Sequence, residues 1–300
     1  MSGWRLAAAP LLLAAVFWLA GPAEVWGTLR GADAGWLAAG LACAFAANLV
    51  SALRWRALCA WMRMVVTPRW AVVTYFRGVA LNVALPGAVV GGDVLRASAL
   101  QRQGHPGAPA AMSVLGDRVS GLWMLVALGL AALASGLDSP QWQLFVARWP
   151  ALAPLGSRPL LLGLLAVFVA LPWIVLRTAG ASAAMLQHPK AAQQYAAQVL
   201  LSLAVQALSV GALGCAAAAV GAPLAPWALA AAAVPIFLMA TLPVSFGGWG
   251  TREAAAAICL VPLGVAPAQA VTLSVIYGLY PVVQAAVALA STGGGAKPPR

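Results

Sequence analysis

The chain has 300 residues, of which 63% are hydrophobic and only 8% are charged. A soluble domain carries roughly 25% charged residues, so this composition cannot cover a water-facing surface and excludes a soluble globular protein. The formal net charge is +11. We attribute this excess to cytoplasmic loops and expect no nucleic-acid partner, because no basic patch with interleaved aromatic residues stands outside those loops.

The fold class follows from the demands of a lipid environment. Backbone polar groups must be satisfied inside the bilayer, and the alternating strands of a barrel are absent, so we expect an all-α polytopic membrane protein. About 20 apolar residues cross the hydrocarbon core. Six such spans are predicted, at residues 6–21, 34–53, 110–135, 159–176, 194–220 and 267–290. The first could also be a signal peptide; we favour a span because the rest of the chain is membrane-embedded.

Two further apolar regions, residues 70–102 and 227–262, are each interrupted midway by a Pro/Gly motif. The first motif reads LPGAVVGGDVLR and the second reads LPVSFGGWGTRE. Each region is too long for one span, and each half is too short for a full one. We therefore expect two re-entrant helical hairpins.

The series of elements occurs twice along the chain. Residues 1–135 contain span, span, hairpin and span; an outer loop follows at 136–158; residues 159–290 then repeat the series. Three spans per half is an odd number, so the second half would be inserted upside down, as in transporters with inverted repeats. Residues 291–300 are expected to form a disordered cytoplasmic tail.

The charges favour cytoplasmic termini, because this topology places bases without acids on the cytoplasmic side. The bases assigned to that side are Arg5, Arg54, Arg56, Arg63, Arg69, Arg102, Arg177, Lys190, Lys297 and Arg300. The outer loops instead hold equal numbers of each sign, namely Glu24, Arg30, Asp33, Asp138, Arg148 and Arg158.

The two interruptions predict an anion-binding cavity. Broken backbone is tolerated in a membrane only where it lines a protein-walled or watery cavity. A half-helix that begins at the break directs free N–H groups and a partial positive charge into that cavity. Glycine lets the backbone approach a ligand closely. The candidate glycines are Gly91, Gly92, Gly247 and Gly248.

Charged residues near the breaks strengthen this prediction. The candidate phosphate ligands are Arg96, Arg118 and Arg252, and their charge partners are Asp93, Asp117 and Glu253. Charge inside a membrane segment is costly and marks a functional candidate. A guanidinium can hold a phosphate bidentately, while the acid balances its charge in the empty site. The alternative is a set of structural ion pairs that lock each hairpin to a span, and for the three acids we favour that role.

Four further residues are candidates for the same site, namely Asn82, Arg77, Ser245 and Trp249. Arg77 could instead extend to the cytoplasmic surface. Asn82 and Ser245 could equally cap helices.

Catalytic chemistry finds little support in the sequence. GxSxG, HExxH and P-loop motifs are absent, and the four cysteines and two histidines form no metal-ligand pattern. We therefore expect no enzyme activity, no cofactor and no metal site.

Three motifs in order resemble those of the lysylphosphatidylglycerol synthase transmembrane-region family: NVALPGAVVGGDVLR, SVLGDRVSGL and LPVSFGGWGTRE. One departure is the Asp before Arg118, where the family pattern would lead us to expect Glu. The resemblance implies a lipid-translocating membrane domain. It does not imply lysyl transfer, which in fused relatives belongs to a separate soluble domain.

We therefore expect a flippase or transporter of the bacterial inner membrane. Its partners would be membrane lipids, and its cargo an anionic lipid of phospholipid, hopanoid or polyprenyl-phosphate type. The alternative is a non-transporting accessory subunit of a lipid-modifying enzyme or glycosyltransferase.

Overall fold

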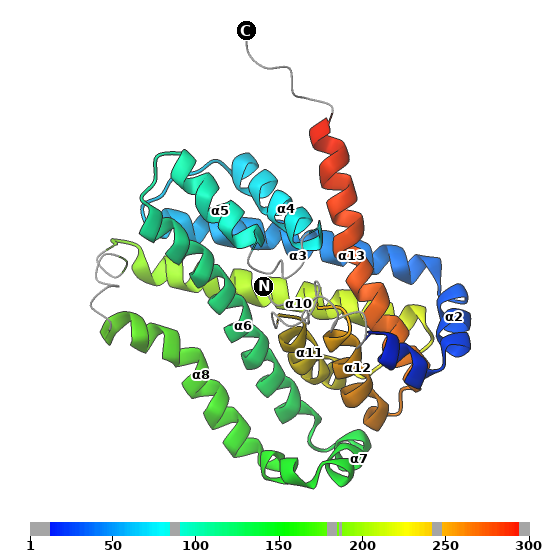
Figure 1. The fold of residues 1–300 in the computed structure, drawn as a ribbon. Helices are drawn as coiled ribbons and strands as arrows, with labels where there is room; N and C mark the ends of the chain where they lie inside the picture. Colours follow the sequence, from blue (N-terminus) through cyan, green and yellow to red (C-terminus); the bar gives the residue numbers. More distant parts are fainter. Residues whose placement is uncertain (1–12, 85–90, 179–184, 186–187, 242–247, 294–300) are drawn as a thin grey trace.

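The computed structural model describes residues 13–84, 91–178, 185, 188–241 and 248–293. The protein is an all-α polytopic membrane protein (Figure 1). Five helices of the described chain are long and apolar enough to cross a membrane: α3 (Ala34–Trp61), α6 (Gly107–Gly136), α8 (Arg158–Thr178), α10 (Ala191–Ala219) and α13 (Pro267–Gly293).

These five helices confirm five of the six predicted spans. Of the sixth, at 6–21, only the last part lies within the described residues; residues 13–20 are helical, and Val16 packs with Val271 of α13. The predicted tail begins at residue 291, but α13 continues through Gly293.

The centre of the fold is an antiparallel pair formed by α3 and α10, which lie side by side in Figure 1. At one end of the pair, the Asp33 N–H donates to the Ala219 carbonyl at 2.9 Å. At the other end, the Trp61 indole N–H donates to the Met185 carbonyl at 2.9 Å. The Asp33 side chain also caps α3. The pair therefore joins the first and second halves of the chain along its whole length.

Each predicted hairpin region contains two short helices. The first region holds α4 (Pro68–Ala84) and α5 (Gly91–Arg102), and the second holds α11 (Pro226–Thr241) and α12 (Thr251–Leu260). The two helices of each pair pack together. The residues between them, 85–90 and 242–247, lie outside the described residues. Re-entry into the membrane stays a prediction.

The helix contacts occur in matching sets. In the first region, α5 packs on α6 of its own half, whereas α4 packs on α13 of the other half. In the second region, α12 packs on α13 of its own half, and α11 packs on α6 of the other half. Both long helices, α6 and α13, are thus held between elements of the two halves.

Short helices cover the end of the molecule beyond the carboxyl terminus of α6. The segment predicted as an outer loop contains α7 (Pro140–Arg148) and the 3-10 helix η1 (Pro150–Gly156). The Ser139 hydroxyl caps α7 by accepting from the Trp142 N–H. The remaining short helices of the described chain are α2 (Pro22–Arg30) and η3 (Val261–Leu263).

The predicted span at 34–53 ends too early. Arg54 does not lie in a loop after that span, because α3 continues to Trp61, and Arg54 is only 4% exposed. The bases of the LRWRALCAW segment end the apolar run in the sequence, whereas in the fold Arg54 is paired with an acid and remains inside the helix bundle.

Candidate functional site

A charged cavity of about 340 Å³ lies among α3, α4, α5, α6, α10, α11 and α13. Both halves of the chain contribute to its walls. Its described charged residues are Arg54, Asp93, Arg96, Asp117 and Arg118. Three arginines against two aspartates leave a formal charge of +1, so the described lining favours a negatively charged ligand.

The five charges form an alternating network. Asp117 accepts from Arg54 Nε at 2.9 Å and from Arg96 Nη1 at 2.8 Å. Asp93 accepts from Arg96 Nη2 at 2.8 Å and also from Arg118 Nε. Arg54 Nη2 donates in addition to the Asp117 carbonyl at 2.9 Å. Each acid therefore bridges two arginines, and one arginine stands at either end.

The two ends of this network differ in exposure. The Arg54 and Asp117 side chains are 4% and 2% exposed, whereas those of Asp93 and Arg118 are 20% and 30% exposed. Between them, the guanidinium of Arg96 lies over the rings of Trp55 and Tyr75, with its carbon 5.2 Å and 4.8 Å from their centroids. Arg54 and Arg96 are therefore fixed by packing, and the Arg118 end is accessible to a ligand.

Close helix crossing positions the start of α5 at the cavity. The Asn82 Oδ1 atom accepts from the Gly92 N–H at 2.8 Å, so Asn82 caps α5 from the preceding helix. A Cβ on Gly92 would lie 2.4 Å from the Gly78 carbonyl oxygen, so only glycine fits there. From this start, Asp93 and Arg96 fall three residues apart on one face and meet the charges of α6.

Arg77 and Gly91 lie elsewhere. They line a separate groove of about 450 Å³ between α4 and α5, together with Arg102. The Arg77 side chain is exposed.

The charges of the second motif form a sealed cluster. Arg252 donates to Glu253 at 2.6 Å and to the Ser274 hydroxyl at 3.2 Å, and its guanidinium carbon lies 4.9 Å from the centre of the Trp249 ring. Arg252 is 4% exposed and Glu253 is completely buried. The Glu253 carboxylate also accepts from the Gly250 N–H at 2.6 Å. This cluster is neutral and fully paired.

Glycines shape the sealed cluster. Gly248 and Gly250 both adopt positive φ, at 82° and 84°, which non-glycine residues rarely do. On α13, a Cβ at Gly278 would lie 1.9 Å from Arg252 Nη2, so this glycine makes room for the guanidinium. The neighbouring residue, Tyr277, lines the charged cavity and stacks on Phe237. The sealed cluster therefore lies behind the Tyr277 wall of the cavity.

The lysylphosphatidylglycerol synthase TM region family model matches residues 5–288, nearly the whole chain. The chain belongs to this family. No curated protein shows a significant match to this chain.

In this family member, the structure separates the predicted site residues into groups. Those that line the charged cavity are Asn82, Gly92, Asp93, Arg96, Asp117 and Arg118. Those of the sealed cluster are Gly248, Trp249, Arg252 and Glu253. Gly247 and Ser245 lie outside the described residues. Among the described residues, no three His, Cys, Asp or Glu side chains gather closely enough to hold a metal ion.

Sequence reasoning missed Arg54 and the polar residues Gln206, Ser209 and Tyr277, all of which line the cavity. For Arg54 a signal was present, because apolar residues resume after it and allow α3 to continue to Trp61. Gln206 and Ser209 lie in the middle of the apolar α10, where polar side chains usually face the interior of a bundle.

Proposed function

We propose that this protein moves an anionic lipid between the leaflets of the bacterial inner membrane and binds the phosphate of that lipid in the charged cavity. The observation that carries the proposal is the excess of one arginine in a cavity that both halves of this membrane protein build. Membership of a membrane-region family named for a lipid synthase agrees with a lipid-related role.

The charge network suggests how a phosphate would enter. Arg118 is the most exposed member and pairs with Asp93, whereas Asp117 is enclosed between Arg54 and Arg96. A phosphate that approaches from the open end would compete with Asp93 for the guanidinium of Arg118, which can bind phosphate oxygens through two parallel N–H bonds. Arg54, Asp117 and Arg96 would stay in place as a rigid base.

We further propose that the two halves are inverted repeats that rock about the central α3–α10 pair. The matching packing of α4 on α13 and of α11 on α6 supports this arrangement. Under this proposal both interrupted regions are re-entrant hairpins that enter from opposite leaflets, both termini are cytoplasmic, and the protein transports lipid without changing it chemically.

A reconstituted-vesicle assay tests the proposal. The full chain is placed in vesicles containing a fluorescent anionic phospholipid. A quencher added outside the vesicles removes the fluorescence of the outer leaflet, so further loss of fluorescence reports lipid that has moved from the inner leaflet. Arg118→Gln should slow the movement about tenfold, since a hydrogen bond to a charged group contributes about 1.5–3 kcal/mol.

Arg102→Gln is the matched control, because Arg102 is exposed at the far end of α5 and does not line the charged cavity. It should leave the rate unchanged. Equal rates for Arg118→Gln and wild type would contradict the site. Wild-type protein that moves no lipid but co-purifies stoichiometrically with a lipid-modifying enzyme would favour the accessory-subunit alternative.

A further inference from the structure

A second cavity follows the charged cavity along the same two helices. The α6 residues Leu122 and Leu125 line the charged cavity, and beginning at Val126 the α6 lining belongs to an apolar pocket of about 230 Å³. On α11, Phe237 and Ala240 line the charged cavity, whereas Val234 and Pro235 line the apolar pocket. The α6–α11 pair therefore passes from a charged lining to an apolar one.

The charged and the apolar linings lie at matching levels of α6 and α11 because the two helices run antiparallel. A Cβ at Gly129 would lie 2.4 Å from Val234 Cγ2, and a Cβ at Gly136 would lie 2.1 Å from the Trp227 ring. Later residues of α6 thus face earlier residues of α11. The two cavities are consecutive along one helix–helix seam.

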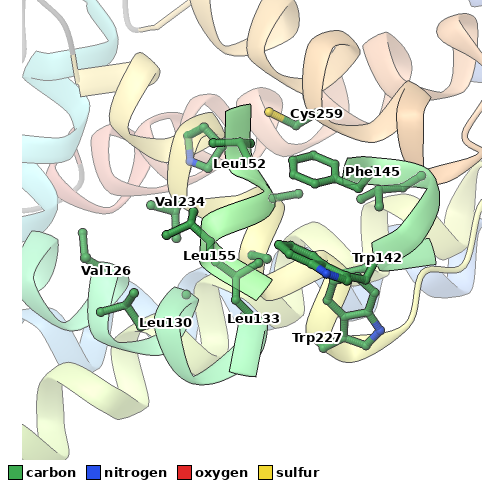
Figure 2. Close-up of a pocket in the computed structure, with 16 residues that line it drawn as sticks. Val126, Leu130, Leu133, Trp142, Phe145, Leu152, Leu155, Trp227, Val234 and Cys259 are labelled. Carbon is green, nitrogen blue, oxygen red and sulfur yellow. The ribbon is translucent and has the colours of Figure 1, made fainter. Parts of the chain in front are cut away.

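The apolar pocket offers nothing to a charged group. Aliphatic and aromatic side chains surround it, and no charged residue is part of its described lining. Figure 2 shows Leu130 and Leu133 of α6 with Val234 of α11, and Trp142, Phe145, Leu152 and Leu155 contributed by α7 and η1. Trp142 and Trp227 lie close together at one side of the pocket in Figure 2. Hydrocarbon is the ligand chemistry that matches these walls.

We infer that the apolar pocket holds one hydrocarbon chain of the lipid whose phosphate occupies the charged cavity. This inference rests on the proposed function. The charged cavity supplies the anion-binding end of the site and the apolar pocket supplies the hydrocarbon-binding end, in the order that an amphiphilic lipid requires.

The dimensions agree with a single lipid molecule. At the α-helical rise per residue, Arg118 and Leu133 are separated by about 22 Å along α6, and Arg118 and Val126 by about 12 Å. One lipid with its headgroup spans about half of a bilayer that is about 40–45 Å thick, or about 20–22 Å. A chain attached to a phosphate at Arg118 therefore reaches the apolar pocket and ends near its far side.

Photo-crosslinking of the full chain in lipid nanodiscs tests the inference. One phospholipid probe carries a diazirine at the end of an acyl chain, and a second carries it beside the phosphate. The acyl-chain probe should label peptides of α7, η1 and α11 that line the apolar pocket. The phosphate probe should label α5 and the part of α6 around Arg118.

A variant in which a larger side chain fills the apolar pocket gives the decisive test. Ala231 lines the apolar pocket, so Ala231→Phe should lower acyl-chain labelling of the pocket about tenfold, because the ring displaces several methylene groups of the lipid. Labelling by the phosphate probe should remain near the wild-type level. Ala166→Phe, at an exposed position of α8, is the control and should change neither signal.

Cys259 gives a second readout on the unaltered protein, because it also lines the apolar pocket. Added anionic phospholipid should slow the reaction of Cys259 with an apolar maleimide, as followed by peptide mass spectrometry. Glycerol phosphate, which lacks the chains, should give no protection.

The outcomes separate the inference from the proposed function. Phosphate-probe labelling around Arg118, combined with acyl-chain labelling spread over exposed helix faces and insensitive to Ala231→Phe, would overturn the inference alone. Failure of the phosphate probe to label α5 and α6 would overturn the proposed function and the inference with it. Equal protection of Cys259 by glycerol phosphate would also contradict a hydrocarbon-binding pocket.

Discussion

The helices α5 and α12 occupy corresponding places in the two halves, and each carries an arginine and an acid in its first turns. On α5, Arg96 and Asp93 face the charged cavity and share their bonds with Asp117 of α6. On α12, Arg252 and Glu253 bond to each other and to an uncharged serine. The first pair belongs to an open network, and the second is sealed.

The difference comes from the long helix that receives each pair. The α6 helix contributes both an acid and a further arginine, whereas α13 contains no charged residue at all. In α13, Ser274 supplies the hydroxyl and Gly278 leaves the space that the Arg252 side chain fills. Similar motifs can therefore differ in role: the first lines a cavity with excess positive charge, and the second joins α12 to α13.

Removal of the central acid should have the largest effect on stability. Asp117→Asn leaves Arg54 and Arg96 buried without the carboxylate that both contact. We expect a loss of about 3–5 kcal/mol in the free energy of unfolding, as for other broken buried ion pairs. Denaturant titration in detergent micelles measures it. A loss below about 1 kcal/mol would mean that water already enters this end of the network.

Loss of the sealed arginine should be somewhat less damaging. Arg252→Gln deprives Glu253 of its ion pair, but the Gly250 N–H and the Ser274 hydroxyl still donate to the carboxylate. We expect a loss of about 3 kcal/mol, at the lower end of the range for buried pairs.

Arg118→Gln should cost about 1 kcal/mol in the same titration, less than Arg252→Gln, since Arg118 is partly exposed. If the two losses were equal, the distinction between an open and a sealed pair would be wrong.

Substitution of Gly92 or Gly278, which both lie very close to neighbouring atoms, should have the next largest effect on stability. Gly92→Ala forces a methyl group against the Gly78 carbonyl, and Gly278→Ala forces one against the guanidinium of Arg252. Overpacking of this kind costs about 1–3 kcal/mol, and Gly92→Ala should be the worse because backbone must move. Thermal unfolding ranks the variants. Gly163→Ala, where nothing lies within 4 Å, should be neutral or stabilising; a comparable loss there would show that the measured effect is not steric.

The exposed ion pair beyond the carboxyl end of α6 should matter least. Asp138 pairs with Arg158 beyond the end of α6, and their side chains are 83% and 48% exposed. Asp138→Asn should change the free energy of unfolding by less than about 1 kcal/mol. A loss as large as that of Asp117→Asn would contradict the view that burial sets the strength of these contacts.

The sequence predicted the long helices well because length and apolar composition determine which segments can cross a bilayer. It also placed Asp93 and Arg96 on one helix face from their spacing. It could not show that Arg54 joins Asp117, since 63 residues separate them and the pairing depends on how α3 packs against α6. Nor could it show that Arg252 is sealed, because that depends on the space left by Gly278 of α13.

A structure of the protein in nanodiscs made of anionic phospholipid tests the central claim most directly. The account predicts a lipid phosphate in the charged cavity, with an oxygen within about 3 Å of the guanidinium of Arg118. An occupied phosphate site found only at the outer helix ends or in the groove beside Arg77, with no phosphate oxygen near the guanidinium of Arg118, would contradict it.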